Sequence, residues 1–277
     1  RPHGIVLATG PTGSGKTTTL YAALGLRRAT AEKIITVEDP VEYHLDGVSQ
    51  VPINTKAGMT FGSALRSILR QDPDVLMVGE MRDPETAQIA VQAAMTGHLV
   101  FSTLHTNDAV SAVARLMDLR AEPYMIAAAL EGVLAQRLVR RVCSDCRRRY
   151  RPDPQMIALL AERPVGRMTL ECGRGCGACR HTGYRGRTGI FELVTVTERF
   201  KQALLQGADG ASLRVMARPR CAPTAGARSR RASPRSRRCC VWCRTDPRPS
   251  APAPADGRSG GRAVAMRCRY AVMPYRA

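Results

Sequence analysis

The sequence has no long uninterrupted hydrophobic run, and none approaches the roughly 20 apolar residues that a membrane-spanning helix needs. This excludes a transmembrane segment within its 277 residues. Residues 1–3 lead directly into a strand-like pattern, so we expect no secretory signal here. An initiator Met is also lacking, from which we expect a fragment of a longer chain.

Aromatic residues are scarce, at 4% of the chain with a single Trp. This argues against a protein that depends on stacking nucleic-acid bases, because such sites are built from aromatic side chains. Hydrophobic residues make up 44%, which is enough for a globular core in a chain of this length.

Cysteine is missing from residues 1–142, although the chain contains ten. Five of them lie in residues 143–179 and five lie after residue 220. An intracellular protein keeps its thiols reduced, so paired Cys-x-x-Cys units indicate a metal site before a disulfide.

Lysine is missing from residues 217–277, which contain 15 Arg and 2 Asp and carry +13 of the formal +19 charge. Pro, Arg, Ser and Ala dominate this tail, and no periodic apolar pattern remains, so we expect it to be disordered. A basic arm for nucleic acid or acidic lipid is the alternative.

The remaining chain alternates apolar strand patterns with helical ones. This alternation predicts an α/β fold with a parallel sheet covered on both faces. Strands are expected at residues 4–9, 34–37, 75–78 and 99–104, and helices at 16–28, 60–70, 84–93, 109–119 and 123–138. The predicted divisions are an α/β core at 1–140, a small Cys-rich insertion at 141–190, the end of the α/β domain at 191–217 and the tail at 218–277.

A glycine-rich loop, Gly-Pro-Thr-Gly-Ser-Gly-Lys-Thr, directly follows the first strand. Its glycines allow backbone N–H groups to face phosphate oxygens, and the next helix adds its positive N-terminal end. Lys16 is expected to reach the β- and γ-phosphates of ATP, and the Thr17 hydroxyl to ligate Mg²⁺. The predicted nucleotide-binding residues are Gly10, Pro11, Thr12, Gly13, Ser14, Gly15, Lys16, Thr17 and Thr18.

Acidic residues follow two of the predicted strands. Glu80 ends the strand that begins after Asp74, where an acid can orient the attacking water or help to hold Mg²⁺. Glu38, Asp39 and Glu42 follow the second strand, at the rim where open sheets bind ligands. The alternative for each is an ordinary solvated acid.

Two histidines, His98 and His105, flank the fourth strand. Either can contact a γ-phosphate as a neutral hydrogen-bonding group, and the alternative is a structural role at each strand end. Cys143-x-x-Cys146 and Cys176-x-x-Cys179 suit tetrahedral Zn²⁺ without an open coordination position. The 29 residues between them exceed the usual spacing, so free thiols remain the alternative. Cys172 lacks a partner at this spacing.

These features together resemble the secretion-ATPase superfamily, and within it the type II secretion and type IV pilus assembly ATPases. The resemblance extends from residue 1 to about residue 217 and implies a RecA-like P-loop NTPase fold, with an ATPase core at 1–140 that is completed by residues 191–217. Its matching stretches are RPHGIVLATGPTGSGKTTTLYAAL, TVEDPVEY, LRSILRQDPDVLMVGEMRDPETAQIAVQAAMTGHLVFSTLHTNDA, EPYMIAAALEGVLAQRLVRRVC and GYRGRTGIFEL.

The resemblance implies roles for several of these residues. Glu80 corresponds to the catalytic acid, with Glu42 also assigned to the catalytic set. Glu38, Asp39 and Glu42 belong to the family's acidic box, and His98 and His105 to its histidine box. The four paired cysteines match a zinc-binding insertion that pilus-retraction members lack, which disfavours retraction. The GVLAQRLVRRVC stretch favours secretion over pilus extension.

The resemblance also implies a homo-hexamer at the cytoplasmic side of the inner membrane, bound peripherally through platform proteins and without a specific nucleic-acid partner. An N-terminal domain that supplies arginines to the nucleotide precedes this core in the family. We therefore expect the 277 residues alone to bind nucleotide weakly and to hydrolyse it slowly or not at all. The alternatives are a nucleic-acid-translocating motor and an inactive truncated fragment.

The family pattern stops near residue 217, and a shifted reading frame explains the residues beyond it. Joining the last base of each codon to the first two of the next turns Cys239-Cys240 into Leu and Trp242-Cys243 into Val. Allowed codons in this stretch give Thr-Ser-Leu-Glu-Glu-Val-Leu-Arg-Val, which resembles the family's ending. We therefore interpret residues 218–277 as an out-of-frame translation, which the DNA sequence would test.

Overall fold

The computed structural model describes residues 3–27, 32–151 and 170–217. Within them the chain forms two compact units, which we call the sheet unit and the cysteine unit. The sheet unit contains the residues up to Arg137 and those from Phe191 onward, and the cysteine unit contains residues 138–190. The interpreted frameshift and the disorder expected of residues 218–277 lie outside the described residues.

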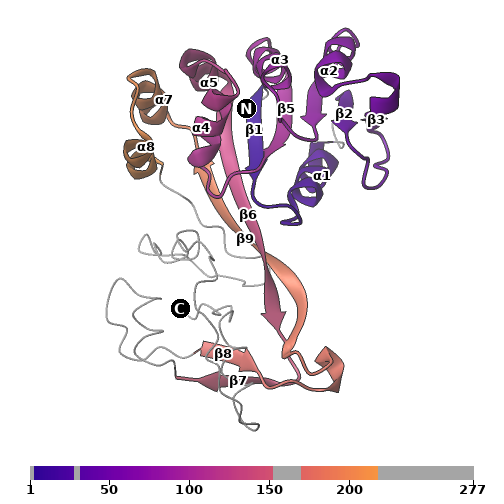
Figure 1. Ribbon diagram of the computed structural model, residues 1–277, viewed down its shortest axis with the longest axis vertical. Coiled ribbons are helices and arrows are strands. Elements are labelled where there is room, and N and C mark those ends of the chain that lie inside the picture. The colour runs from indigo at the N-terminus through magenta and orange to yellow at the C-terminus, as the bar shows by residue number, and fades with distance from the viewer. Residues whose placement is uncertain (1–2, 28–31, 152–169, 218–277) are drawn as a thin grey trace, which may run out of the picture. The chain divides into compact units, whose positions relative to one another are not determined.

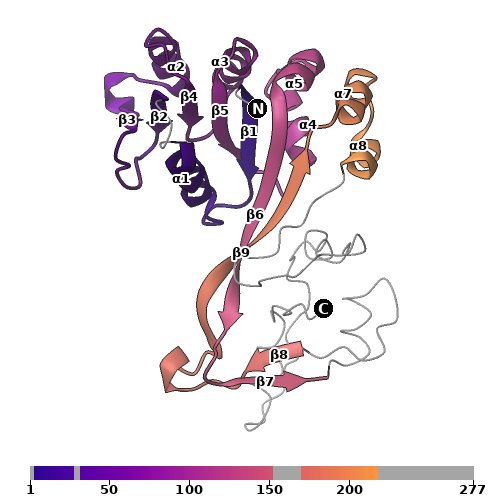
Figure 2. The same ribbon diagram turned by 180° about the vertical axis from the view of Figure 1, so that it is seen from behind.

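A seven-stranded sheet with the order β3-β2-β4-β5-β1-β6-β9 organises the sheet unit (Figure 2). The pairs β1–β5, β1–β6, β2–β3, β2–β4 and β4–β5 are all parallel, which confirms the predicted α/β class. The strands are β1 (Gly4–Thr9), β2 (Ile34–Glu38), β3 (Ser49–Pro52), β4 (Val75–Val78), β5 (Leu99–Leu104), β6 (Leu130–Val142) and β9 (Tyr184–Thr195).

Helices cover both faces of this sheet (Figure 1). Side chains alternate along each strand, so Ile5 and Leu7 of β1 join one core cluster while Ala8 joins the other. The cluster of Ala8 includes Leu20 and Leu24 of α1, and the cluster of Leu7 takes in the remaining helices. The helices are α1 (Lys16–Arg27), α2 (Phe61–Leu69), α3 (Pro84–Met95), α4 (Ser111–Asp118), α5 (Pro123–Ala129), α7 (Glu198–Leu205) and α8 (Gly210–Met216), with a short 3-10 turn η1 (Thr55–Ala57).

The helix predicted over residues 123–138 is wrong in its second half. Helix α5 ends at Ala129, and β6 begins at the next residue, Leu130. From Gly132 to Ala135 this strand pairs in parallel with β1. The hydrogen bonds available at the edge of β1 therefore override the helical apolar spacing, as tertiary context does for weak local preferences.

The start of α3 fixes the path of the chain after β4. Asp83 caps the helix, and its carboxylate accepts hydrogen bonds from the Thr86 backbone N–H and hydroxyl, each at 2.8 Å. Pro84 occupies the first turn, where the absence of an N–H group costs nothing. This cap holds the segment that carries Glu80 between the strand and the helix.

The cysteine unit contains two antiparallel strands, β7 (Arg147–Tyr150) and β8 (Leu170–Gly173). Arg147 pairs with Gly173 and Tyr150 with Leu170. The segment that carries the first Cys-x-x-Cys pair therefore lies next to the segment that leads to the second. A 3-10 turn, η2 (Gly177–Cys179), follows β8. None of the helices in the described ranges is long and apolar enough to cross a membrane.

Candidate functional site

The glycine-rich loop connects the end of β1 to the start of α1, in the middle of the parallel sheet. Gly13 and Gly15 have φ values of 74° and 85°, which side-chain-bearing residues rarely adopt. Gly10 is constrained by space, because a Cβ atom there would lie 2.3 Å from the carbonyl oxygen of Gln136. The loop therefore needs glycine at these positions for conformation or for close approach.

Lys16, the first residue of α1, is almost completely buried within this loop. Its ammonium group donates hydrogen bonds to the carbonyl oxygens of Gly10 at 2.9 Å and Pro11 at 3.2 Å. Burial lowers the pKa of Lys16, and the nearby charge of Glu80 opposes this shift. The lysine and the acid predicted to act on ATP are therefore close enough to interact electrostatically.

The other loop residues differ in accessibility. Thr17 is half-buried, whereas Pro11, Thr12 and Thr18 are exposed. The Ser14 hydroxyl is buried and has no hydrogen-bond partner within the described part of the chain. A buried hydroxyl without a partner is unfavourable, so this loop has an unsatisfied polar atom that a polar ligand can satisfy.

Glu80 follows β4 by two residues, and its side chain is 13% exposed. One of its carboxylate oxygens lies 2.7 Å from the Arg82 guanidinium, and the other lies 3.4 Å from Nε2 of His105. The structure thus brings together Glu80 and His105, two residues singled out from the sequence. Arg82 was missed, although a cation two residues after the acid was a usable signal.

The loop after β5 is tied to the end of β1 by two threonines. The Thr106 backbone N–H donates to the Thr9 hydroxyl at 2.9 Å, and the two hydroxyl oxygens lie 2.7 Å apart. Thr9 precedes the glycine-rich loop and Thr106 follows His105. His105 is therefore held at the carboxyl end of the parallel strands, where the glycine-rich loop begins.

His98 lies at the opposite end of β5, at the amino end of the parallel strands. Its carbonyl oxygen accepts a hydrogen bond from Gly4 N–H at 3.1 Å, and its Nδ1 lies 2.9 Å from the Ala93 carbonyl oxygen. The six residues of β5 separate it from His105, a span of roughly 20 Å. The structure does not bring His98 to the glycine-rich loop of its own chain.

The three acids at and after the end of β2 differ in burial. Glu38 is buried, and its carboxylate accepts hydrogen bonds from the hydroxyls of Tyr21 and Thr36, the latter at 2.5 Å, and from the Gln50 amide at 3.2 Å. Burial, followed by the contact with Glu38, raises the pKa of Tyr21. Glu38 is therefore satisfied by neutral donors inside the protein.

Asp39 and Glu42 are exposed. A hydrogen bond to Glu80 is the main cause of the raised pKa of Arg82, and Asp39 adds to it through its charge. Arg82 thus lies close enough to both acidic segments to interact with each. The binding and catalytic roles predicted for Glu38, Asp39 and Glu42 stay predictions.

Gln136 is a site residue that the sequence patterns did not indicate. It lies on β6 and is 4% exposed. Its side chain contacts the carbonyl oxygen of Ser14 in the loop and the hydroxyl of Thr19 in α1. No sequence signal marked it, because the apolar spacing of residues 130–138 predicts a helix.

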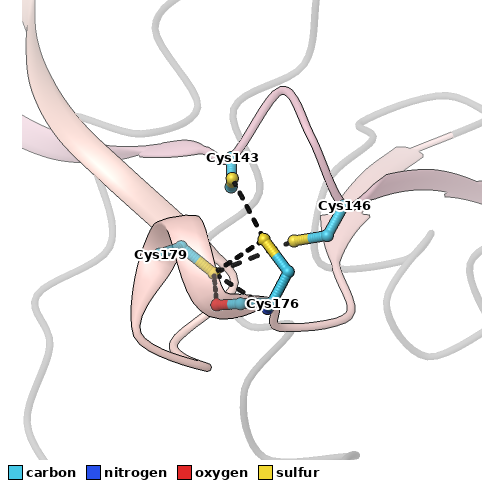
Figure 3. A group of neighbouring side chains, drawn as sticks. All are labelled: Cys143, Cys146, Cys176 and Cys179. Carbon is cyan, nitrogen blue, oxygen red and sulfur yellow. Dashed lines mark hydrogen bonds between the residues drawn. The ribbon is translucent and has the colours of Figure 1, made fainter.

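Four cysteines of the cysteine unit converge on one point (Figure 3). Cys143 and Cys146 lie between β6 and β7, whereas Cys176 directly precedes η2 and Cys179 is its last residue. Their sulfur atoms all lie within 4.8 Å of one another, and three sulfur pairs are separated by 3.7 to 3.9 Å. A tetrahedron with Zn–S bonds of about 2.3 Å has edges of about 3.8 Å, so the four thiols fit Zn²⁺.

Backbone N–H groups surround these sulfur atoms. Gly175 N–H donates to Cys146 Sγ at 3.3 Å, and Cys176 and Gly183 N–H both donate to Cys179 Sγ at 3.2 Å. Burial raises the pKa of Cys146 to about 12. Burial also opposes ionisation of Cys179, but the two N–H donors together with the Cys176 and Cys146 thiols outweigh it and lower the pKa of Cys179 to about 6. Such donors favour thiolates and orient metal ligands.

Cys172 is buried on β8 and does not belong to the group of four. This agrees with its lack of a partner at the Cys-x-x-Cys spacing. Within the described residues, the four-cysteine group is the only set of three or more His, Cys, Asp or Glu ligands close enough to share a metal ion.

Comparison with known families gives a match over residues 1–235 to the family described as type II/IV secretion system protein. The chain is 56% identical over 204 residues to type II secretion system protein E of Pseudomonas aeruginosa. It is 55% identical over 204 residues to type II secretion system ATPase E of Vibrio cholerae. Each alignment covers 74% of this chain and 41% of the relative, so the chain spans less than half the length of these relatives.

Solved structures share this architecture. The pilus retraction motor PilT, solved with bound ADP, gives a TM-score of 0.58 at 30% identity and covers 78% of this chain and 54% of its own. The ATPase DotB of Legionella pneumophila gives 0.56 at 26% identity, again over 78% of this chain, and 52% of its own.

Proposed function

Because the chain belongs to the type II/IV secretion system protein family, we propose that it is the ATP-hydrolysing core of a motor that powers type II protein secretion. The observation that carries the proposal is the position of Glu80. It lies beside the glycine-rich loop, is held by Arg82 and His105, and interacts electrostatically with Lys16. Secretion is favoured over pilus retraction because relatives named for type II secretion are 50–56% identical, against 30% for the pilus retraction motor.

The proposed mechanism assigns binding to the loop and orientation of water to Glu80. Backbone N–H groups of the loop and the ammonium of Lys16 hold the phosphates of ATP, with the Ser14 hydroxyl available as a further polar contact. We assign Mg²⁺ binding to Thr17, where the ion would neutralise negative charge on the phosphates. Glu80 pairs with Arg82, lies 3.4 Å from Nε2 of His105, and in this proposal orients water for attack on the γ-phosphate.

His105 is the residue through which the state of the site can reach the rest of the sheet. It contacts Glu80 and is joined to the end of β1 through the adjacent Thr106 and Thr9. We assign the sensing of the γ-phosphate to His105. The same role for His98 lacks support from contacts within this chain, where it lies at the other end of β5.

A binding experiment tests the first half of this proposal. In the protein at its natural length, we expect Lys16→Ala to weaken binding of Mg-ADP by roughly 10- to 100-fold, because it removes a charged donor to phosphate. Lys56→Ala is the matched control, since Lys56 is an exposed lysine in η1. Titration calorimetry measures both variants, and equal affinity of Lys16→Ala and wild type would refute the site.

A turnover experiment tests the second half. We expect Glu80→Gln, in the protein at its natural length, to keep ATP binding but to slow hydrolysis by about 10²- to 10⁴-fold, the typical contribution of a general base. Phosphate release measured with and without added DNA also separates a secretion motor from a nucleic-acid motor. Normal turnover by Glu80→Gln would refute its role, and strong stimulation by DNA would favour the nucleic-acid alternative.

The family and the fold support further proposals about the assembly. We place the motor in a homo-hexamer at the cytoplasmic face of the inner membrane, where it acts on platform proteins of the secretion system. Association with the membrane is peripheral, through these partners. Mass measurement of the protein at its natural length, with and without nucleotide, tests the hexamer.

The cysteine unit is proposed to hold one Zn²⁺ in a structural role. The four sulfur atoms of Cys143, Cys146, Cys176 and Cys179 match a tetrahedral site, and the backbone donors around them suit thiolates. With four protein ligands no coordination position remains for chemistry. Zn²⁺ would supply a cross-link between the segment after β6 and the segment around η2.

A further inference from the structure

Gln136 lies on β6, and its polar side chain is buried against the glycine-rich loop. Its amide Nε2 donates to the Ser14 carbonyl oxygen at 2.8 Å, and its Oε1 accepts from the Thr19 hydroxyl at 2.7 Å. A primary amide carries a donor and an acceptor at one tip, and here each meets a complementary partner. Both contacts join segments more than 100 residues apart in the chain.

The contact with Ser14 determines the direction of the following backbone N–H. In a planar trans peptide, the C=O and N–H bonds point in opposite directions. Because the Ser14 carbonyl points toward Gln136, the N–H of Gly15 points away from β6. Backbone N–H groups at this position of such loops are the ones that face bound phosphate.

The contact with Thr19 adds the second constraint. Thr19 lies in the first turn of α1, where its backbone N–H donates to the Gly15 carbonyl oxygen at 3.1 Å. One side chain therefore holds both the loop and the helix that follows it. The backbone of β6 also lies close against the loop at Gly10, where a Cβ atom would clash with the Gln136 carbonyl oxygen.

We propose that Gln136 is a positioning residue of the nucleotide site, which orients the Ser14–Gly15 peptide so that the Gly15 N–H faces the bound phosphate. The inference rests on the proposed function, since it assumes that the loop binds nucleotide. Gln136 does not touch the nucleotide itself in this arrangement. Its loss acts through the loop backbone.

Two substitutions at Gln136 test the donor. Gln136→Met keeps the length and removes both hydrogen bonds, whereas Gln136→Glu keeps an acceptor but places a carboxylate against the Ser14 carbonyl. At pH 8 we expect both variants to bind Mg-ADP about tenfold more weakly than wild type, the effect of roughly one lost buried hydrogen bond.

A pH comparison separates positioning from a general packing defect. Burial and the adjacent carbonyl raise the pKa of an introduced Glu, so lowering the pH to 6 protonates it and restores an O–H donor toward Ser14. Gln136→Glu should then recover several-fold relative to Gln136→Met. The Met variant, measured at both pH values, reports every other effect of pH on binding.

Substitutions at Thr19 keep the test decisive if the Gln136 variants fail to fold. Thr19→Ser retains the hydroxyl and should bind within about twofold of wild type, whereas Thr19→Val should lose roughly three- to tenfold. Circular dichroism and the unfolding temperature establish that each variant is folded at the assay temperature.

The outcomes separate this inference from the proposed function. If Lys16→Ala binds Mg-ADP poorly but folded Gln136→Met and Thr19→Val bind as wild type does, the inference on Gln136 is overturned alone. If Lys16→Ala binds as wild type does, the proposed function is overturned. Weak binding by the Met variant, with recovery of the Glu variant at low pH, supports the inference.

Discussion

The sheet unit and the cysteine unit are held together by different physical means. The sheet unit buries apolar side chains on both faces of a parallel sheet, with Leu7, Val78 and Val100 all completely inaccessible. In the described part of the cysteine unit, residues 138–151 and 170–190, only five side chains are buried. They are Cys143, Leu170, Cys172, Cys179 and Tyr184.

The two units also differ in charge. The described part of the cysteine unit contains ten Arg against one Asp and one Glu, and most of these arginines are exposed. The described part of the cysteine unit therefore has little apolar core to stabilise it. On the proposal of a Zn²⁺ site, a metal cross-link does in this unit what apolar burial does in the sheet unit.

The largest expected effect is therefore loss of metal from the cysteine unit. Structural Zn²⁺ contributes an apparent free energy of about 10–16 kcal/mol at neutral pH, so its removal should unfold this unit. We expect one Zn²⁺ per chain in the wild type and none in Cys176→Ser, measured by elemental analysis. Amide NMR signals of residues 170–190 should lose dispersion in the variant.

Two controls sharpen this prediction. Cys172→Ser should retain one Zn²⁺ per chain, because Cys172 lies outside the group of four sulfur atoms. Binding of Mg-ADP by Cys176→Ser, with Mg²⁺ in excess, should stay within about twofold of wild type if the sheet unit folds without the metal. Full Zn²⁺ content in Cys176→Ser would contradict the metal site.

The next effect concerns the apolar core of the sheet unit. Leu7 on β1 is fully buried, so Leu7→Ala should lower the free energy of unfolding by about 2–5 kcal/mol. Leu26→Ala is the control, because the Leu26 side chain is 81% exposed and its loss should change stability by less than about 0.5 kcal/mol. Urea unfolding followed by circular dichroism measures both, with Zn²⁺ content unchanged. Similar stabilities of the two variants would contradict the core assignment.

A smaller effect is expected at the cap of α3 in the sheet unit. Asp83→Ala removes both hydrogen bonds to Thr86 and should lower the free energy of unfolding by about 1 kcal/mol. Asp83→Asn keeps a side-chain acceptor and should cost only a fraction of that. Thermal unfolding compares the two, and an equal loss in both would assign the effect to charge and not to capping.

The smallest effect is expected from the ion pairs of the cysteine unit. Glu171 lies 3.6 Å from Arg147 and 3.5 Å from Arg149, whose side chains are 60% and 63% exposed. The Glu171 side chain is itself only 12% exposed, but both arginines extend into water, so we expect these ion pairs to contribute about 1 kcal/mol or less and salt to screen them. Glu171→Gln should therefore change the midpoint of zinc-linked unfolding only slightly at low salt and not at all in about 1 M NaCl. A large shift at low salt that disappears in about 1 M NaCl would mean that charge makes a major contribution to the stability of this unit.

The strands that pack in the centre of the sheet were predictable because they are buried on both faces. Strands β1, β2, β4 and β5 read as continuous apolar runs, which is typical of parallel sheets. Strand β3 was missed because it is short, lies at the edge and is largely accessible. Strand β6 was assigned to a helix because its pairing with β1 cannot be seen in local spacing.

The candidate nucleotide site also combines features that local patterns reveal with features that depend on long-range contacts. Gly10 to Thr17 could be identified because an unbroken segment forms the loop. Arg82, Gln136 and the buried environment of Glu38 depend on segments that are distant in sequence. For the same reason, local patterns could not tell which of His98 and His105 lies near the glycine-rich loop. The register of β5 with β1 places them at opposite ends of the parallel strands.

Local sequence patterns were enough to identify the chemical groups of the candidate sites: a glycine-rich loop, an acid at a strand end and two pairs of thiols. Local patterns suffice there, because each depends on neighbouring residues or on a fixed short spacing. Which of these groups meet depends on the fold. The register of the sheet brought Glu80 to His105 and Gln136 against Ser14, and it buried the Glu38 carboxylate in a hydrogen-bond network. Such contacts follow from long-range pairing, which local patterns do not contain.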